Sequence, residues 1–421
     1  KMAILSIVVL AAVIGVACWK KLNAGVLSII GAFFLMVISG NGTKGGLANF
    51  NGTLFIQYAM TMLVYGTASY TGGLSLLLKK ILRVTGNKVV RYLPLIMYSL
   101  GLAASLAGAG GTVFNALIII TAVLGPNLGI NPLLMPVMML LGCNAGTLHP
   151  KHQAGLVAAS VFEPLGYGAS EAWTLYYVAT ILATLFALCL YIVLKGYKVN
   201  VSGSMDLEEG TVKFNYAQKV TLIGMLVQII LTNVTPWDVG MIAATIVIAE
   251  ILLGALTEKE ALTSIVSYPT LIMICGVSIL VKQVQAFGGI DLIVHVFSPL
   301  INKATVTPFV AAMSGALSWV SSTMGVVMPT VIPLLDGFSA SVGGSVGFTT
   351  LLCACVSTSH MAAISPMSTG GGSIMAYVSS QDPKADTEKY FGNLWIISIL
   401  AVLFNVVVSL LGFVGVFSGL F

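Results

Sequence analysis

Charged residues are scarce in this sequence: Asp, Glu, Lys and Arg make up 8% of its 421 residues, whereas hydrophobic residues make up 57%. A water-soluble protein covers itself with polar and charged side chains, so this shortage excludes an ordinary soluble fold. Apolar runs of about 20 residues, each long enough to cross the core of a bilayer as a helix, recur along the whole chain. The composition therefore predicts an all-α polytopic membrane protein embedded in a lipid bilayer.

Signs of a bound cofactor or of nucleic-acid binding are also lacking. The six cysteines all lie in apolar segments, which is typical of buried thiols and not of a disulfide framework or a zinc site. The formal charge of +5 comes from basic residues in the predicted loops between spans, so no nucleic-acid partner is expected. No cofactor is expected, and Na⁺ or H⁺ is the candidate coupling ion.

Ten membrane spans are predicted from the apolar runs. They lie near residues 3–19, 24–39, 54–78, 132–161, 172–194, 219–232, 238–255, 262–284, 346–376 and 391–418. Two further apolar stretches, 93–124 and 308–335, are interrupted by small and hydroxyl residues. We expect these two to be re-entrant hairpins, because irregular backbone at membrane depth is tolerated only inside protein or beside a water-filled cavity.

Basic residues indicate the orientation of these spans. With two re-entrant hairpins, almost all Lys and Arg fall on one side of the membrane, mainly in the stretches 20–21, 79–91 and 195–219. The positive-inside rule makes that side cytoplasmic. The sequence thus predicts a multi-pass protein of the cell inner (plasma) membrane with both termini outside the cytoplasm. Trp173 and Tyr176 lie near a span end, where interfacial anchors are expected.

The two halves of the chain follow the same order. Residues 1–194 form the first predicted repeat, with hairpin 93–124 and a broken helix at 132–161. The polar stretch 195–218 is a cytoplasmic linker, and residues 219–421 form the second repeat, with hairpin 308–335 and a broken helix at 346–376. Each repeat has five spans and one hairpin, and the two are inverted in the membrane. Inverted repeats with broken helices at the midplane are typical of alternating-access carriers.

Matched small and helix-breaking residues mark four segments as candidate sites. Gly111 and Gly325 lie in the two hairpin turns, and their separation along the chain nearly equals that of Pro150 and Pro366 in the two broken spans. A proline inside a span removes a backbone donor and frees a carbonyl. The resulting half-helix N-termini suit anions, while the freed carbonyls suit cations.

Positive charge is concentrated in the first broken span, at His149, Lys151 and His152. A charge at membrane depth costs roughly 2.5–3.5 kcal/mol on insertion scales, so it rarely persists without a role. We expect Lys151 to pair with a substrate carboxylate; the alternative is a break near the surface, from which Lys151 reaches water. The two histidines would donate hydrogen bonds or carry a coupling proton, although a structural role stays open for both. Glu250 is expected to reach water at the cytoplasmic end of its span.

The four segments resemble those of the ion-transporter superfamily, in particular the divalent-anion/sodium symporters and the malonate and dicarboxylate carriers. Ser321-Ser322-Thr323 is similar to the Ser-Asn-Thr triplet of the second hairpin tip in that branch, and Ser365-Pro366 with Ser368-Thr369 is similar to the break that follows it. The first hairpin tip differs from the Ser-Asn-Thr pattern, because its sequence is Ala107-Gly108-Ala109. The resemblance implies a homodimer whose transport domain moves against a static scaffold, in an elevator-type mechanism.

Candidate ligands follow from these motifs. The expected substrate-binding residues are Gly108, Ala109, Gly110, Asn144, Thr147, His149, Lys151, His152, Ser321, Ser322, Thr323, Ser365, Pro366, Ser368 and Thr369. The candidate sodium ligands are Ser105, Gly111, Ser318, Thr323, Gly325, Ser359 and Ala363. We expect no enzymatic activity, and no Asp or Glu lies at these segments, which argues against a strict cation exchanger.

The predicted function is a secondary active transporter of small organic anions, C3–C4 dicarboxylates in the first place, by cation-coupled symport or exchange. Citrate, gluconate or another anion of the superfamily is the alternative substrate. A channel is a less favoured alternative, since nothing here resembles a selectivity filter. The Gly343-x-Ser345-x-Gly347 pattern of serine hydrolases opens a predicted span instead of a strand-to-helix elbow, so we interpret it as chance.

Overall fold

The computed structural model describes residues 1–20, 22–40, 50, 52–73, 76–77, 80, 91–106, 114, 130–198, 212–235, 237–266, 268–368, 370–375 and 387–421. All regular structure in these ranges is helical. Three helices are long and apolar enough to cross a membrane: Ala169–Val193, Thr323–Ser341 and Lys389–Leu410. A fourth is formed if Cys275–Ala286 and Gly289–Phe297, which meet at an angle of 75°, count as one span. Eight shorter apolar helices accompany them, and a helical membrane protein is confirmed.

The helices of the first half are α1 (Met2–Lys20), α2 (Ala24–Ser39), α4 (Gly52–Tyr70), α6 (Leu93–Leu106), α8 (Leu134–Thr147), α9 (Gln153–Phe162) and α10 (Ala169–Val193). The second half contains α11 (Tyr216–Val234), α12 (Val239–Leu252), α13 (Glu258–Glu260), α14 (Tyr268–Ala286), α15 (Gly289–Phe297), α16 (Val306–Val320), α17 (Met328–Val331), α18 (Leu335–Ser341), α19 (Phe348–Ala362), α21 (Thr387–Leu410) and α22 (Phe413–Ser418).

Helix boundaries recur between the two halves at a nearly constant spacing. The helices α1 and α11 both have 19 residues, and so do α4 and α14. The separation between the two starts is almost the same in five pairs of helices, namely α1 with α11, α2 with α12, α4 with α14, α6 with α16, and α8 with α19. These helices of the first half therefore have counterparts, in the same order, in the second half.

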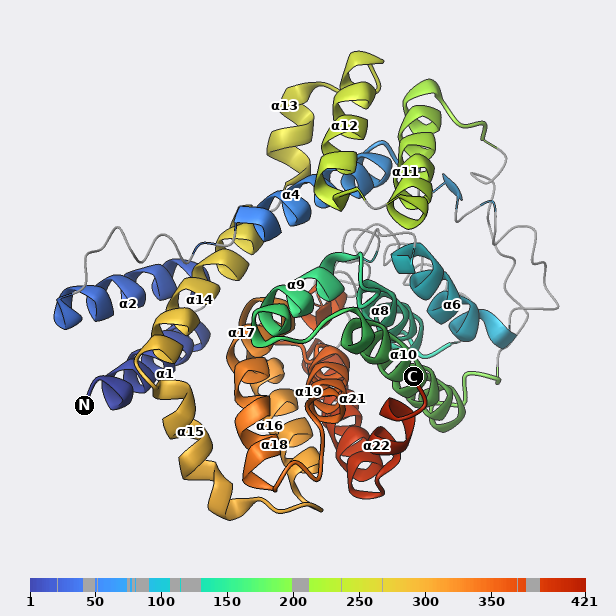
Figure 1. Cartoon of the computed structure of the whole chain (residues 1–421). Coiled ribbons are helices and arrows are strands. Elements are labelled where there is room, and N and C mark those ends of the chain that lie inside the picture. The colour runs from blue at the N-terminus through green and yellow to red at the C-terminus, as the bar shows by residue number, and fades with distance from the viewer. Residues whose placement is uncertain are drawn as a thin grey trace.

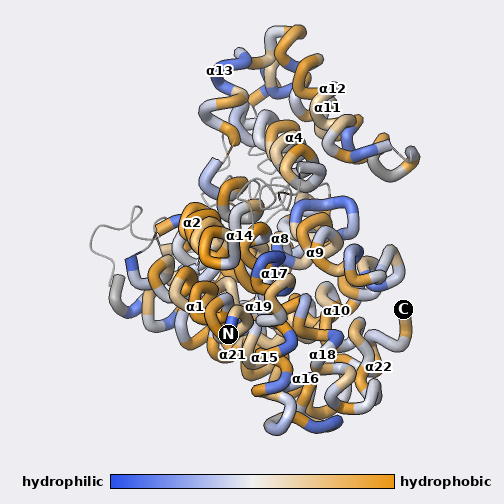
Figure 2. The backbone as a smooth tube through the Cα atoms, turned by 60° about the vertical axis from the view of Figure 1, so that its left-hand side comes forward, coloured by the Kyte–Doolittle hydropathy of each residue, from blue (hydrophilic) through white to orange (hydrophobic). Residues whose placement is uncertain are grey.

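Contacts divide the described helices into two groups, each drawing on both halves of the chain (Figure 1). We call α6, α8, α9, α10, α16–α19, α21 and α22 the bundle, and α1, α2, α4, α11, α12, α14 and α15 the flanking helices. The two groups touch where α9 meets α4 and where the segment 323–341 meets α2, α14 and α15. In Figure 2 the helices α1, α2 and α14 are mostly hydrophobic, whereas hydrophilic residues gather in short stretches such as α13.

Glycines in the left-handed region end two helices, one of them inside a predicted span. Gly412 has φ +76° and separates α21 from α22, so the predicted last span 391–418 is two helices. Gly288 has φ +73° and lies at the sharp bend between α14 and α15. Residues with a Cβ rarely adopt these angles, which explains why the chain turns at glycine there.

The stretch of the second predicted hairpin consists of two helical segments, and it extends further along the chain than predicted. Its first arm is α16, its turn contains Ser321 and Ser322, and its second arm runs from Thr323 to Ser341 through a π-helical turn, α17, a 3₁₀ turn and α18. For the first predicted hairpin, α6 is the first arm. Apart from Phe114, the stretch 107–129 lies outside the described residues.

Candidate functional site

Both predicted broken helices are interrupted at their prolines. In the first, α8 ends at Thr147, and α9 begins at Gln153, so the break spans 148–152. In the second, α19 ends at Ala362, and helix resumes over 370–375. Gly371 lies in this last stretch.

The two breaks have the same main-chain geometry. When Pro150 is aligned with Pro366, four hydrogen bonds of the first break recur, with closely similar lengths, at the corresponding positions of the second. They are Leu148 N to Ala145 O (3.3 Å) and Ile364 N to Met361 O (3.4 Å); His149 N to Gly146 O (3.2 Å) and Ser365 N to Ala362 O (3.0 Å); His152 N to His149 O (2.9 Å) and Ser368 N to Ser365 O (2.9 Å); and Leu156 N to His152 O (2.8 Å) and Gly372 N to Ser368 O (2.9 Å).

A glycine is required at the same place in each break. A Cβ on Gly155 would lie 2.1 Å from the main-chain oxygen of His149, and a Cβ on Gly371 would lie 2.1 Å from that of Ser365. Gly155 and Gly371 correspond to each other in the same alignment of the two breaks. The chain passes so close to its own carbonyls at these points that no other residue fits without a shift of the backbone.

Different side chains support the two breaks in equivalent ways. The N–H of Lys151 donates to Nδ1 of His149 at 3.3 Å, and the N–H of Met367 donates to Oγ of Ser365 at 3.3 Å. Each break is also tied to the end of its hairpin arm. His152 Nε2 bonds the main-chain oxygen of Leu106 in α6 at 2.8 Å, and Ser365 Oγ bonds that of Trp319 in α16 at 2.7 Å.

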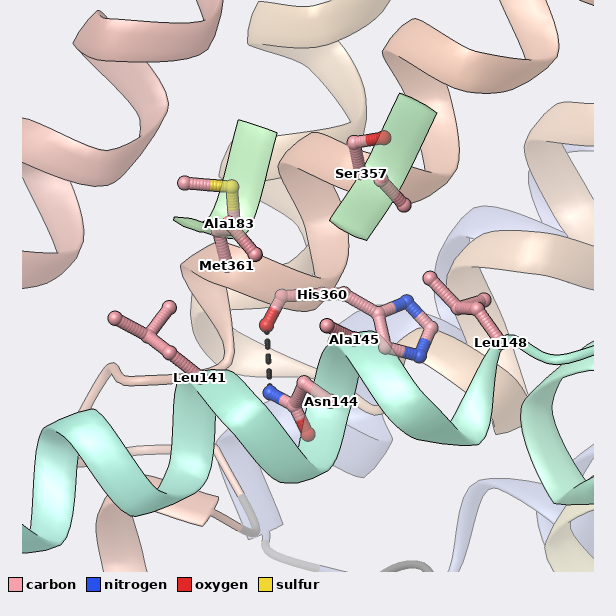
Figure 3. Close-up of a pocket in the computed structure, with 9 residues that line it drawn as sticks. Leu141, Asn144, Ala145, Leu148, Ala183, Ser357, His360 and Met361 are labelled. Carbon is pink, nitrogen blue, oxygen red and sulfur yellow. Dashed lines mark hydrogen bonds between the residues drawn. The ribbon is translucent and has the colours of Figure 1, made fainter. Parts of the chain in front are cut away.

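The two broken helices meet directly. Asn144 of α8 donates from Nδ2 to the main-chain oxygen of His360 in α19, at 2.8 Å (Figure 3). A cavity of about 10 Å³, on the order of one water molecule, lies beside this contact. Its lining is mostly apolar, but it includes Ser357, whose buried Oγ has no hydrogen-bond partner among the described residues.

Hydroxyl and carbonyl oxygens converge at the second hairpin tip. Ser318 Oγ and Thr323 Oγ1 lie 2.9 Å apart, and both donate to the main-chain oxygen of Ser359, at 2.7 and 3.0 Å. Ser322 Oγ accepts from the N–H of Gly325 at 3.1 Å. Three of the candidate sodium ligands are therefore in mutual contact, and oxygen donors of this kind suit a hard monovalent cation.

Aromatic side chains surround His149. Its ring lies 4.4 Å from that of His152, 5.0 Å from that of Trp173 and 5.5 Å from that of Tyr176. Sequence reasoning assigned Trp173 and Tyr176 to the membrane interface and missed this contact. Their i, i+3 spacing places them on one face of α10 and was the available signal.

The other predicted site residues either contact main-chain groups of the breaks or lie outside the described residues. Thr147 Oγ1 donates to the main-chain oxygen of Asn144 at 2.9 Å, and Ser368 Oγ donates to the main-chain oxygens of Ser365 and Ala363. The Ser105 side chain packs against Gly146 of α8. Gly108, Ala109, Gly110, Gly111 and Thr369 lie outside the described residues. No cluster of three or more His, Cys, Asp or Glu side chains that could hold a metal ion occurs in the described ranges.

Residues 1–147 match the protein family described as "Dicarboxylate carrier protein MatC N-terminus". The predicted resemblance to dicarboxylate carriers is confirmed. The fold is similar to a solved structure, "Crystal structure of the Alcanivorax borkumensis YdaH transporter reveals an unusual topology", with a TM-score of 0.54 over 87% of this chain and 86% of that one. At 14% identity this likeness concerns the fold alone. No curated protein sequence matches this chain. A transporter, and not an enzyme, is therefore supported.

Proposed function

We propose that this protein is a secondary active transporter of small organic anions, with C3–C4 dicarboxylates as substrates. The observation that carries the proposal is the pair of equivalent breaks, in direct contact through Asn144 and His360. Interrupted helices leave main-chain donors and acceptors available to a ligand at membrane depth, as carriers require. Lys151 at the first break supplies the positive charge that a dicarboxylate needs, and His149 and His152 beside it are side chains that can hydrogen-bond to a carboxylate.

The recurring helix boundaries support an inverted repeat with five spans and one hairpin in each half. The division into bundle and flanking helices supports an elevator-type mechanism. Both breaks and the described arms of both hairpins belong to the bundle, which would move as the transport domain against the flanking helices. The resemblance to dicarboxylate carriers supports a homodimer, and the distribution of Lys and Arg along the chain supports an inner-membrane protein with both termini outside the cytoplasm.

Sodium is the proposed coupling ion at the second hairpin tip. Ser318 Oγ, Thr323 Oγ1 and the main-chain oxygen of Ser359 form a compact set of oxygens there. The hydroxyls would turn their protons away and present lone pairs when the ion binds. Na⁺ and the anion would then be carried together, because each offsets the charge of the other in a site of low dielectric constant.

Uptake into proteoliposomes tests the proposal. Labelled malonate and succinate would be offered to wild type, to Lys151→Ala and to the matched control Lys303→Ala, with Na⁺ and pH gradients imposed separately. Removing the Lys151 ammonium should weaken apparent anion affinity by roughly 10- to 100-fold, as expected for a charged hydrogen bond worth about 1.5–3 kcal/mol. The exposed Lys303 lies in a loop, so its variant should match wild type. Wild type that moves neither anion under any gradient would rule out the dicarboxylate assignment.

A further inference from the structure

Hydrogen bonds determine which ring nitrogen carries the proton in each histidine of the first break. Nδ1 of His149 accepts from the N–H of Lys151, so it bears a lone pair and the ring proton is on Nε2. His149 is therefore neutral in this arrangement. It could take up a second proton only by losing the hydrogen bond that shapes the break.

His152 makes its hydrogen bond through Nε2, whereas His149 uses Nδ1. Its Nε2 lies 2.8 Å from the main-chain oxygen of Leu106, and a carbonyl oxygen can only accept, so Nε2 carries the proton. Nδ1 then bears a lone pair. This atom is buried and makes no hydrogen bond of normal geometry in the described part of the chain, although the backbone of Lys151 lies close to the ring, and the residue as a whole is 1% exposed. A buried polar atom without a partner is uncommon and points to a ligand.

The equivalent side chain in the second break, Ser368, is hydrogen-bonded within the protein, unlike Nδ1 of His152. Ser368 corresponds to His152 when Pro366 is aligned with Pro150, and its hydroxyl donates to the main-chain oxygens of Ser365 and Ala363. The two breaks share their backbone but differ at this side chain. The first half has a basic nitrogen where the second half has a hydroxyl that is already satisfied.

We propose that Nδ1 of His152 binds a proton that is co-transported with the anion in addition to the sodium ion, an inference that rests on the proposed function. The proton comes from solution and forms an N–H bond at Nδ1. The new N–H then donates to a carboxylate oxygen of the bound anion, while Nε2 keeps its bond to Leu106. On the other side of the membrane the anion and the proton leave, and the neutral ring is restored.

The charges around the ring make proton binding depend on the anion. His149 and Lys151 are the charged or titratable groups that act on His152 electrostatically. The helices packed closest to this break, α4, α6 and α8, contain no Asp, Glu, Lys, Arg or His, and neither do the turns 323–327 and 332–334 or α17.

Two carboxylates lie on the remaining elements that pack on α9. Glu163 follows the last residue of α9, at the opposite end of that helix from His152. Glu171, in the first turn of α10, bonds the N–H of Gly168. Tyr176 of α10 is a further titratable group beside His149.

No carboxylate lies on the described elements that pack closest to the break, so none is available on them to balance an imidazolium at His152. A second positive charge is unfavourable in the unloaded site and becomes favourable when a carboxylate arrives. Anion and proton therefore bind together, which is the condition for coupled transport.

Accumulation at equilibrium tests this inference. Proteoliposomes with the membrane potential clamped would receive pH gradients of zero and one unit, in the absence of Na⁺ gradients. One coupled proton should raise the accumulation ratio of labelled malonate by about tenfold for each pH unit. In His152→Gln the amide nitrogen can still donate to Leu106, but nothing titrates, so the tenfold response should disappear. His295→Gln, the same substitution at an exposed histidine of α15, should keep it.

Each outcome decides the question. Wild type that accumulates malonate with a Na⁺ gradient but gives no response to pH would overturn the proton site and leave the proposed carrier intact. A tenfold response that survives in His152→Gln would also overturn it. Absence of uptake by wild type under any gradient would instead reject the proposed function. If His152→Gln is not monodisperse after purification, His152→Asn takes its place and must lose the response.

Discussion

Asn144 donates a hydrogen bond of 2.8 Å to the main-chain oxygen of His360, and the two residues occupy equivalent positions in the two halves of the chain. The same spacing separates Pro150 from Pro366 and Gly155 from Gly371. The contact therefore lies where the two repeats meet, and it holds the first broken helix against the second.

Removing this contact should destabilise the bundle. Asn144→Ala leaves the buried main-chain oxygen of His360 without its donor, at a cost of about 1–3 kcal/mol. Asn144→Asp should be worse, because a carboxylate cannot donate and adds a buried charge. Thermal unfolding of the purified protein in detergent measures both effects. Equal melting temperatures for wild type and Asn144→Ala would show that the contact does not contribute to stability.

The glycines of the two breaks should be equally intolerant of substitution. In Gly155→Ala and Gly371→Ala the new Cβ would meet a main-chain oxygen at 2.1 Å, so the backbone has to move, at a cost of roughly 1–3 kcal/mol. Gly347→Ala is the matched control, since a Cβ there meets nothing within 4 Å and φ is −72°. Because Gly347 is the N-cap of α19, where Ala is poorer than Gly, the control should lose no more than about 1 kcal/mol. If unfolding measurements showed that Gly347→Ala loses as much stability as Gly155→Ala and Gly371→Ala, the close main-chain contacts at the two breaks would not be the cause of the loss.

Much of the fold could be predicted from the sequence, because proline, glycine and apolar length act locally. Pro150 and Pro366 marked both breaks, and their spacing, which matches that of the hairpin glycines, indicated the repeat. Long-range contacts could not be predicted in this way. No local pattern shows that Asn144 faces His360, or that Trp173 packs on His149, since each depends on how two helices are rotated against each other. The bend at Gly288 could not be predicted, because the sequence contains 45 glycines and no local pattern distinguishes this one from the others.

Glu250 is the clearest departure from the sequence-based expectation. It was expected to reach water, but it is only 2% exposed, and neither carboxylate oxygen makes a hydrogen bond of normal geometry among the described residues, although the side chain of Thr67 lies close to it. It lies in the last turn of α12, against Gly224 of α11, where a Cβ would approach its Oε1 to 2.2 Å. A side chain in this place has to be uncharged to avoid a large desolvation cost.

Glu250→Gln should consequently be tolerated. The amide has the same size as the protonated carboxyl and no charge, so stability should equal or exceed that of wild type. Glu250→Ala leaves an unfilled space and should lose about 1–3 kcal/mol. Thermal melts of both variants distinguish these effects. A Glu250→Gln variant as unstable as Glu250→Ala would mean that the ionised carboxylate has a partner and contributes to stability.

The second hairpin tip provides the test of sodium coupling. Thr323→Val keeps the shape of the side chain but replaces its hydroxyl, which lies 2.9 Å from Ser318 Oγ and 3.0 Å from Ser359 O. Because a valine methyl cannot ligate Na⁺, the sodium concentration needed for half-maximal uptake should rise roughly tenfold or more, as expected for the loss of about 1.4 kcal/mol of binding free energy.

Ser345→Ala is the control for this prediction. Its hydroxyl is exposed and, among the described residues, bonds only the main-chain oxygen of Val342 in its own turn. Uptake by Ser345→Ala should equal that of wild type. This result would also show that Ser345, the serine of the Gly343-x-Ser345-x-Gly347 pattern, has no role in transport. An unchanged sodium dependence in Thr323→Val would place the coupling ion elsewhere and leave the proton at His152 as the driving ion.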